Sequence, residues 1–417
     1  MNNNFYDYDF ESGKVIVALN NNVIYSDSPD YYISQILYGI DFEKADVIFR
    51  PNKINNESDM GYVLLVYLKS KEKSAVIDAV EQLTANPFVA YAEPDFFYET
   101  HIIPNDPYFP YLWGLKELKL PSAWEHTTGN NNVVVGVMDS GIDYNHPDIK
   151  SNMWVSRDKQ YINGWDFFNR NADSMDRSGH GTHVAGTIGA AGNNFIGITG
   201  ICWNVEIASL RIGHIFMNLA AIIEAIDFSN TNKIQILNNS WGGSAYSRIL
   251  KYAIEQYDGL FIASAGNYGA DNDEIPDYPS SFDSDNIISV AATNPDGNLA
   301  PFSNYGIKSV DIAAPGTDIL SLSLHGEYSY QTGTSMSAPH AAGAAALLKS
   351  YMPDLTALDI KNIILSSVDK KPNLKNKILT GGILNIESMI EMANSFTATS
   401  KNNRQIDMLL LKQTLII

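Results

Sequence analysis

Residues 333–343 read Gly-Thr-Ser-Met-Ser-Ala-Pro-His-Ala-Ala-Gly and continue as Ala-Ala-Ala-Leu-Leu-Lys-Ser-Tyr-Met at 344–352. This stretch predicts a helix that begins close to Ser335. A hydroxyl in the first turn of a helix lies near free backbone N–H groups and the positive end of the helix dipole. Ser335 is therefore a candidate nucleophile, although a serine that only caps its helix is the alternative interpretation.

Two further segments of this kind lie upstream. Residues 138–143, Met-Asp-Ser-Gly-Ile-Asp, follow the apolar run 133–137, and residues 178–186 read Ser-Gly-His-Gly-Thr-His-Val-Ala-Gly. An aspartate at the carboxyl end of a parallel strand lies where α/β proteins place their sites, whereas a lone Asp-Ser-Gly indicates only a turn. His180 and His183 are poor candidates for a metal site, because no HExxH motif or third soft ligand accompanies them.

Taken together, these segments supply Asp139, His180 and Ser335 in that order along the chain. Nucleophilic acyl transfer needs such a set, because an imidazole must accept the proton of the serine and a carboxylate must hold the imidazole in the right tautomer. Residues 264–267, Ser-Ala-Gly-Asn, follow another apolar run. The side-chain amide of Asn267 is therefore a candidate to stabilise an oxyanion.

The rest of the chain shows two patterns of predicted elements. Short apolar runs that alternate with helices predict a mostly parallel sheet covered on both faces. The first hundred residues instead show the order β-α-β-β-α-β, which is typical of a ferredoxin-like unit. The apolar runs lie at 133–138, 207–211, 233–237, 260–263 and 287–292, with helices at 218–228 and 247–257. The first unit has strands at 14–19, 47–49, 62–68 and 88–92 and helices at 31–40 and 74–85.

Composition excludes several classes of function. The 417 residues include 28 Lys plus Arg against 47 Asp plus Glu, a formal net charge of −19, which argues against nucleic-acid binding and suits calcium or basic substrates. The single cysteine, Cys202, excludes an intramolecular disulfide and a cysteine-based zinc cluster. No stretch approaches the roughly 18–20 apolar residues of a membrane span. Residues 1–10 lack the basic and apolar regions of a secretory signal.

The three motifs resemble those of the subtilisin-like serine proteases, the subtilases, over roughly residues 104–392. The order Asp-His-Ser is itself known from subtilisin. The resemblance implies endopeptidase activity and an α/β fold: a three-layer α/β/α sandwich with a mostly parallel, seven-stranded sheet. It also implies roles, with Asp139 orienting the imidazole, His180 as general base and then acid, and Ser335 as nucleophile. Asn267 and the Ser335 backbone N–H would form the oxyanion hole, aided by Thr334.

The same resemblance implies where a polypeptide substrate binds. Residues 239–243, Asn-Ser-Trp-Gly-Gly, are similar to the edge strand that pairs with the substrate backbone. Asp277, by rough alignment, falls at the floor of the primary specificity pocket, where an acid favours Lys or Arg at P1 unless its side chain points outward. The substrate-binding residues are expected to be Ser240, Trp241, Gly242, Ser264, Gly266 and Asp277.

Calcium, in a structural role, is the cofactor that the resemblance implies, with no catalytic metal. A first group of oxygen ligands matches family positions, and a second group lies in residues 165–176, where a solvated acidic loop is the alternative. The first group is Asp106, Asp148, Asn193 and Asn194, and the second is Asp166, Asp173 and Asp176.

Residues 61–68 and 85–99 are similar to the propeptide domain of subtilases, which assists folding and inhibits the enzyme. The expected organisation is a small ferredoxin-like α+β prodomain at 1–100, a processing linker at 101–106, the peptidase domain at 107–393 and a tail at 394–417. We expect self-cleavage between Glu99 and Asp106, and a monomer inhibited by its own propeptide. The alternatives are an inactive homologue that acts as a binding protein and a dedicated cytosolic processing protease. A propeptide favours secretion and the missing signal favours the cytosol, so the location stays open.

Overall fold

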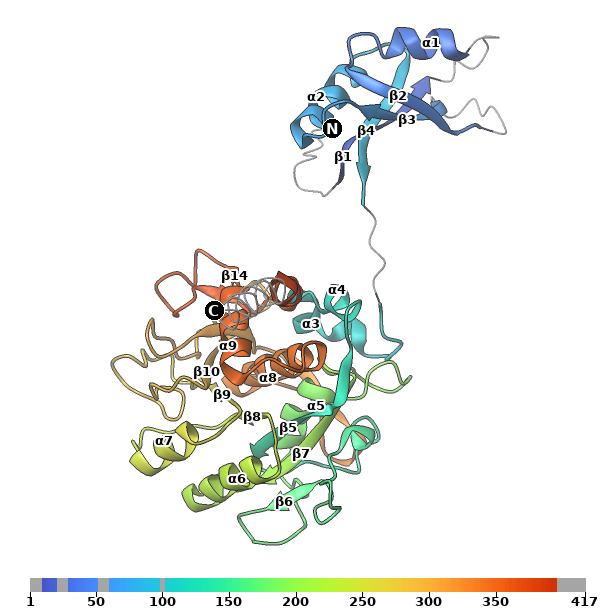
Figure 1. The fold of residues 1–417 in the computed structure, drawn as a ribbon. Coiled ribbons are helices and arrows are strands. Elements are labelled where there is room, and N and C mark those ends of the chain that lie inside the picture. Colours follow the sequence, from blue (N-terminus) through green and yellow to red (C-terminus); the bar gives the residue numbers. More distant parts are fainter. Residues whose placement is uncertain (1–9, 21–28, 52–59, 98–101, 396–417) are drawn as a thin grey trace, which may run out of the picture. The chain divides into compact units, whose positions relative to one another are not determined.

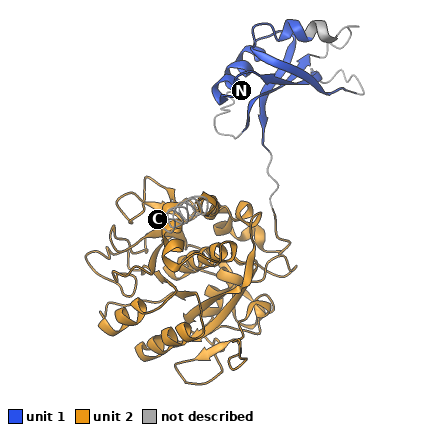
Figure 2. Cartoon of the chain, in the orientation of Figure 1, with its two compact units in different colours: residues 1–100 blue, residues 101–417 orange. Residues whose placement is uncertain are grey.

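The computed structural model describes residues 10–20, 29–51, 60–97 and 102–395. The chain divides into two compact units, residues 1–100 and 101–417 (Figure 2). The expected cleavage interval, Glu99 to Asp106, therefore lies partly outside the described residues, as does nearly all of the expected tail from residue 394 onward.

The first unit is a four-stranded antiparallel sheet with the strand order β2-β3-β1-β4 (Figure 1). Its core joins alternate residues of β1, Val15 and Val17, to the apolar face of α2, Val76 and Val80. This is the predicted ferredoxin-like order. The elements are β1 Phe10–Asn20, α1 Pro29–Ile36, β2 Phe42–Phe49, β3 Met60–Leu68, α2 Lys73–Thr84 and β4 Val89–Phe96. Helix α1 ends before the predicted residue 40 because the chain turns at Gly39, whose φ is +91°.

The second unit is built on a nine-stranded sheet with the order β14-β15-β11-β10-β9-β8-β5-β7-β6. Every neighbouring pair is parallel except β14 and β15, which confirms the mostly parallel sheet. The strands are β5 Gly129–Asp139, β6 Gly164–Asp166, β7 Asn204–Arg211, β8 Ile236–Asn239, β9 Leu260–Ser264, β10 Ile287–Thr293, β11 Ile312–Pro315, β14 Asp369–Lys370 and β15 Gly382–Ile383, with a separate hairpin of β12 Ile319–Leu322 and β13 Tyr328–Gln331.

The strand count exceeds the expected seven. Strands β6, β14 and β15 have only three, two and two residues, too few to show a hydrophobic period in sequence. Strand β8 begins at Ile236 rather than at the predicted Lys233, because Lys233 has a φ of +57° that no strand can contain.

Helices cover both faces of this sheet (Figure 1). Side chains along β5 alternate between two cores: Val135 and Val137 belong to the core that contains α5, α8 and α9, and Val134 and Met138 to the core that contains α6 and α7. The helices are α3 Trp113–Glu117, α4 Leu120–Trp124, α5 His180–Gly189, α6 Leu219–Thr231, α7 Arg248–Glu255, α8 Thr334–Tyr351 and α9 Ala357–Ser366, with 3₁₀ turns at Phe109–Tyr111, Lys150–Asn152 and Leu324–Gly326.

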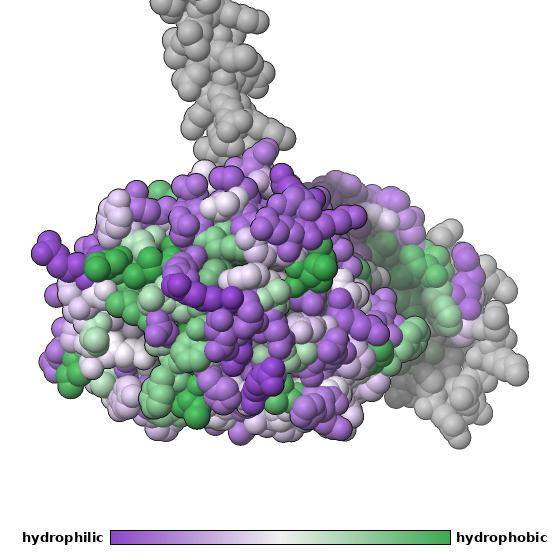
Figure 3. Space-filling model, turned by 90° about the horizontal axis from the view of Figure 1, so that it is seen from below, coloured by the Kyte–Doolittle hydropathy of each residue, from purple (hydrophilic) through white to green (hydrophobic). Residues whose placement is uncertain are grey.

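Helix α8 is buried along nearly its whole length, and its alanines and Gly343 allow the close packing that this requires. A Cβ at Gly343 would lie 2.8 Å from the side chain of Ile201, so no larger residue fits there. On the face shown in Figure 3, apolar residues lie in patches among hydrophilic ones, as on most protein surfaces. None of the helices in the described ranges combines the length and apolar character that crossing a bilayer requires.

Candidate active site

Asp139 and His180 meet at the carboxyl end of the sheet. Asp139 is the last residue of β5 and is fully buried, and His180 is the first residue of α5. The His180 Nδ1 lies 2.8 Å from the Asp139 Oδ1, which also accepts a hydrogen bond of 2.7 Å from the Ser140 backbone N–H. Burial alone would lower the pKa of His180, but the charge and hydrogen bond of Asp139 raise the pKa above its ordinary value. The ring therefore has its Nε2 available to act as a base.

Asp176 holds the first turn of α5 in place. Its buried carboxylate accepts hydrogen bonds from the Thr182 backbone at 3.0 Å, the Thr182 hydroxyl at 2.7 Å and the Ser140 hydroxyl at 3.0 Å. The Ser140 hydroxyl in turn accepts the Gly181 N–H at 3.0 Å. Burial favours protonation of Asp176, but the hydrogen bonds from Ser178 and Thr182 outweigh it and lower its pKa. Sequence reasoning missed this positioning role of Ser140 and Asp176.

Ser335 lies in the first turn of α8, as predicted, and is partly exposed. Its hydroxyl donates to the Ser240 carbonyl at 3.1 Å, and the Ser240 hydroxyl donates to the Ser335 carbonyl at 2.8 Å. Ser240 also lines one groove together with His180. Ser240, the first residue after β8, therefore links the serine of α8 to the groove in which the imidazole lies.

Asn267 is oriented by the start of α8. Its Oδ1 accepts the Thr334 N–H at 2.8 Å and the Thr334 hydroxyl at 3.0 Å, so the amide nitrogen Nδ2 must point the other way. A Cβ built at Gly333 would lie 3.5 Å from this Nδ2, 3.6 Å from the Oδ1 and 3.7 Å from the Ser335 backbone nitrogen. The Asn267 amide and the Ser335 N–H therefore lie close to one point beside Gly333.

The groove beside His180 has two walls. One wall is Ser240, Trp241, Gly242 and Gly243, the predicted substrate-binding strand, and the other is the loop at 214–217. Ile215 and Phe216 of this loop are 75% and 86% exposed and give the groove an apolar rim.

The residues predicted for the primary pocket converge. The Gly266 N–H donates to the Thr334 hydroxyl at 3.1 Å, which ties the segment after Ser264 to the start of α8. A Cβ at Gly266 would lie 3.4 Å from the Asp277 Cγ, and a Cβ at Gly242 only 2.1 Å from the Asp277 Oδ1. Asp277 is buried. Its carboxylate therefore lies against both glycines rather than pointing outward.

The first predicted calcium group comes together. Asp106 accepts the Asn193 backbone N–H at 2.7 Å, and Asp148 accepts the Asn194 side-chain amide at 2.8 Å and the Ile198 N–H at 2.9 Å. Burial raises the pKa of Asp148 to about 6, with a smaller contribution from the charge of Asp106. A divalent cation would relieve this repulsion between the two carboxylates. Their oxygens already accept protein N–H groups, and the described residues contain no cluster of three or more His, Cys, Asp or Glu side chains that could hold a metal ion.

The second predicted calcium group does not come together as one set of ligands. The Asp166 carboxylate pairs with Arg211 at 2.6 Å, where both side chains are buried, and Asp173 pairs with Arg177 at 3.1 Å. Asp176 holds the start of α5 instead. Each carboxylate is thus satisfied by a separate protein partner, which the spacing of acids in sequence could not show.

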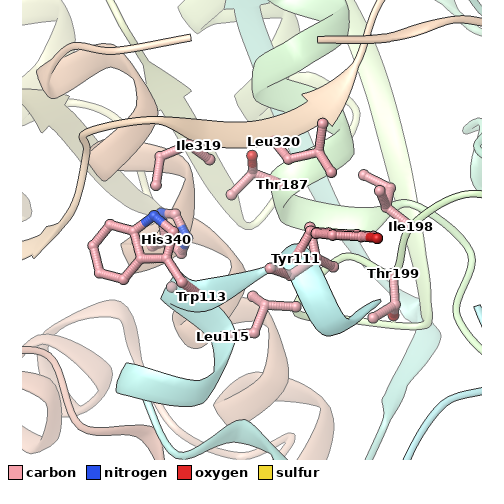
Figure 4. Close-up of a pocket in the computed structure, with 11 residues that line it drawn as sticks. Tyr111, Trp113, Leu115, Thr187, Ile198, Thr199, Ile319, Leu320 and His340 are labelled. Atoms are coloured by element: carbon pink, nitrogen blue, oxygen red, sulfur yellow. The ribbon is translucent and has the colours of Figure 1, made fainter. Parts of the chain in front are cut away.

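Two other buried histidines have structural roles. The Nε2 of His183 donates to the Ile319 carbonyl at 2.9 Å, and the Nδ1 of His340 donates to the Met336 carbonyl at 2.8 Å. Burial lowers the pKa of each to about 4, so both stay neutral. His340 and Trp113 line a small cavity of about 20 Å³ (Figure 4), enough for one water molecule and too small for a substrate.

An Asp-His pair at the carboxyl edge of a parallel sheet, with a serine at the start of a central helix, is an arrangement typical of α/β serine hydrolases. Residues 130–382 match the subtilase family of peptidases. The chain is 35% identical over 297 residues to the thermophilic serine proteinase of Bacillus sp. (strain AK1), a match that covers 70% of each protein.

Other relatives agree with this match. Subtilisin-like protease 2 of Plasmodium falciparum (isolate 3D7) is 35% identical over 67% of this chain and 22% of that protein. Subtilisin-like protease 1 of Plasmodium berghei (strain Anka) is 34% identical over 72% of this chain and 56% of that protein, so this chain spans only part of both relatives. A solved protease structure from Pseudoalteromonas arctica PAMC 21717 superposes with a TM-score of 0.62 and 28% identity, covering 70% of this chain and 99% of that one. The chain belongs to the subtilase family.

Proposed function

We propose that this chain is an endopeptidase that hydrolyses peptide bonds through an acyl-enzyme, with Ser335 as nucleophile, His180 as base and Asp139 as the orienting acid. The observations that carry the proposal are the His180–Asp139 contact of 2.8 Å and the closeness of the Asn267 amide and the Ser335 N–H to one point beside Gly333. These two groups are the donors that would hold an oxyanion formed at Ser335 during acyl transfer.

In the first half of the reaction, the Ser335 hydroxyl turns from the Ser240 carbonyl toward His180, loses its proton to the imidazole Nε2 and attacks the scissile carbonyl. The carbonyl oxygen becomes an oxyanion held by the Asn267 Nδ2 and the Ser335 N–H. The Asp139 carboxylate stabilises the imidazolium, which then protonates the leaving amine. In the second half, His180 activates a water molecule that hydrolyses the acyl-enzyme.

The substrate backbone is proposed to add to residues 240–243 as a further strand. The backbone of Gly243 pairs with Tyr278 through hydrogen bonds of 2.9 and 2.8 Å, which holds this segment extended along the groove. Strand addition positions a substrate through its backbone and leaves its side chains to be selected by the groove walls.

We further propose that residues 1–100 form a propeptide that is removed by self-cleavage and inhibits the enzyme until then. The support is the separate four-stranded unit with its own core. N-terminal sequencing of an active preparation tests this: a new N-terminus between Glu99 and Asp106 supports processing, and an intact Met1 contradicts it.

A structural calcium ion is proposed for the group formed by Asp106, Asp148, Asn193 and Asn194. The ion would neutralise the two buried carboxylates and crosslink the start of the second unit to the loop after α5. The chemistry at Ser335 needs no metal, because the base and the oxyanion donors are protein groups.

A fluorophosphonate probe tests the proposed nucleophile directly. We expect the probe to label the wild type once its propeptide has been removed, Ser335→Ala to abolish labelling and His180→Ala to slow it at least a hundredfold. Ser337→Ala is the matched control, because Ser337 lies two residues further along the same helix and is buried; it should label normally. A folded wild-type chain that is not labelled would favour the inactive homologue.

A further inference from the structure

We propose that His214 and His180 together bind a divalent transition-metal ion, Zn²⁺ or Cu²⁺, and that the bound ion reversibly inhibits the peptidase. The inference goes beyond the proposed endopeptidase function and also rests on it, because His180 is the proposed base. It is carried by the position of the two imidazoles in one groove, by the absence of a partner for His214 and by the chemistry of the groove around them.

Both histidines line the groove, and both are linked to Asp139. The Nδ1 of His180 lies 2.8 Å from the Asp139 Oδ1. The second link runs through the main chain: β7 is parallel to β5 with Arg211 opposite Asp139, and the Ile212 N–H donates to the Asp139 carbonyl at 3.0 Å. His214 follows two residues later, so its Cα lies within about 8 Å of the Ile212 Cα.

The loop that contains His214 is short and closed at its base. Gly213 and Met217 form an antiparallel bridge, and the Asn218 N–H donates to the Ile212 carbonyl at 3.0 Å. Residues 214–216 therefore form the tip of the loop, and all three line the groove. A tip of this length keeps its side chains near the end of β7, where the link to Asp139 is made.

The imidazole of His214 is free to bind a ligand. It is exposed and has no hydrogen-bond or ion-pair partner in the part of the chain that the structure describes. The rings of His183 and His340 differ, because they are buried and bonded to the carbonyls of Ile319 and Met336. An exposed histidine is common on protein surfaces. The place of His214 in the same groove as His180 is what distinguishes it.

His180 already has the environment of a metal-ligating histidine. Metal-bound imidazoles usually donate their second N–H to a carboxylate, which fixes the tautomer and raises the basicity of the ligating nitrogen. The Nδ1 of His180 makes such a bond to Asp139, and the His180 side chain is 33% exposed. Its Nε2 therefore remains as a lone-pair donor for an ion in the groove.

The groove favours one kind of cation. Among the described residues, its lining contains no Asp, Glu, Lys or Arg side chain, so it offers neither carboxylate ligands nor a fixed positive charge that would repel an ion. Imidazole nitrogen suits Zn²⁺ and Cu²⁺, whereas Ca²⁺ and Mg²⁺ prefer oxygen ligands. The site is therefore different in chemistry from the proposed calcium group at Asp106 and Asp148.

Two imidazoles leave part of the coordination sphere to water. The described ranges contain no group of three or more His, Cys, Asp or Glu side chains that could hold a metal ion, so they supply no third ligand of these kinds. The groove has a volume of about 620 Å³, which is room for the ion and its waters. Binding is thus reversible and weaker than at a structural zinc site, where four protein ligands enclose the ion.

A metal ion on His180 stops catalysis at its first step. The Nε2 lone pair that accepts the Ser335 proton is then bound to the ion, so the hydroxyl is not activated and no acyl-enzyme forms. The ion also occupies the groove beside residues 240–243, where the substrate backbone is proposed to add. Inhibition should therefore be competitive with a peptide substrate.

The test uses the processed wild type and one chromogenic peptide in a buffer without chelators. ZnCl₂ should inhibit competitively, and CuCl₂ should inhibit at lower concentration, in the general order of metal affinities. MgCl₂ at the same concentrations should have no effect. Dialysis against zinc-free buffer that contains CaCl₂ should restore the activity, which separates reversible binding from denaturation.

Variants locate the ion. His214→Ala should raise the inhibition constant for zinc at least tenfold, because loss of an outer-shell partner alone already costs about 10–100-fold in metal affinity. Each constant is measured against the variant's own uninhibited rate, so a change in that rate does not affect it. His126→Ala is the matched control, because His126 is exposed outside the groove; it should leave the constant within twofold of wild type. Zinc should also slow fluorophosphonate labelling of the wild type but not of His214→Ala.

The outcomes separate the two levels of inference. An active wild type that zinc does not inhibit, or inhibition that His214→Ala leaves unchanged, overturns the metal site and leaves the endopeptidase intact. Inhibition lost equally in His126→Ala also overturns the site, because it shows unspecific binding to exposed histidines. A processed wild type that neither cleaves the peptide nor reacts with the fluorophosphonate in zinc-free buffer overturns the proposed function and this inference with it.

Discussion

The side chain of Asn267 has two roles, as a hydrogen-bond acceptor for Thr334 and as a donor near the Ser335 N–H, and two substitutions can separate them. The Oδ1 accepts hydrogen bonds of 2.8 and 3.0 Å from Thr334, and the Nδ2 borders the space beside the Ser335 N–H. Asn267→Ala removes both atoms. Asn267→Asp keeps an acceptor for Thr334 but puts a carboxylate oxygen where the donor was.

The two substitutions should therefore change the free energy of unfolding by different amounts but lower kcat by a similar factor. Each hydrogen bond to Thr334 contributes about 0.5–1.5 kcal/mol, so Asn267→Ala should lower the free energy of unfolding by about 1–3 kcal/mol. Asn267→Asp should lose less. Removing one oxyanion donor costs about 2.7–4 kcal/mol of transition-state stabilisation, or about 10²–10³ in kcat, a magnitude known from subtilisin and not worked out from this chain.

The assay measures kcat and KM on one chromogenic peptide, and urea unfolding is measured on the same preparations. All variants are folded in the presence of the wild-type propeptide. We expect kcat to fall at least a hundredfold in both variants, with KM changed less than threefold, because the donor acts on the oxyanion rather than on the bound substrate. A kcat within tenfold of wild type for folded Asn267→Ala would refute the oxyanion role. An increase in KM with kcat unchanged would show that Asn267 binds the substrate in its ground state.

Three further predictions follow from the charges of the site. The raised pKa of His180 means that kcat/KM for an uncharged substrate should fall as pH decreases, with its half-maximal point above 6.5. Asp166→Asn leaves Arg211 buried without its partner and should cost about 3–5 kcal/mol in urea unfolding, whereas Asp173→Asn breaks an exposed pair and should cost less than about 1 kcal/mol. EGTA should lower the melting temperature of the wild type but not of Asp148→Asn, and the effect should weaken at acidic pH, because protons compete with the cation for Asp148.

Each of these predictions has an outcome that contradicts it. A half-maximal pH below 6.5 would show that Asp139 does not stabilise the imidazolium. Equal losses for Asp166→Asn and Asp173→Asn would show that the buried pair with Arg211 is no stronger than the exposed one. A melting curve that EGTA leaves unchanged would argue against calcium at Asp148.

Most of the large sheet and the triad could be predicted from local patterns. Apolar runs such as 133–138 are continuous because both faces of a parallel strand are buried, so they stand out in sequence. Asp139 and His180 were found because each follows or begins a regular element next to glycine. Strands β6, β14 and β15 could not be predicted, because two or three residues are too few to show a hydrophobic periodicity.

The environment of each acid could not be predicted in this way. Asp148, Asp166, Asp176 and Asp277 are each a single carboxylate in sequence, and their neighbours along the chain do not indicate what each will contact. The fold gives Asp148 a carboxylate neighbour, Asp166 an arginine and Asp176 the start of a helix, whereas Asp277 has a backbone N–H and no cation among the described residues. These partners come from segments far apart along the chain, which local composition does not encode.

The sequence by itself therefore determined the class of chemistry, because acyl transfer needs a fixed set of side chains next to glycines and helix starts, and these leave a local pattern. Only the tertiary structure decided which atoms of Asn267 are held and which are presented, and that the Asp277 carboxylate is buried against Gly242 and Gly266. Orientation and burial depend on atoms brought together from distant segments, which a local pattern does not encode.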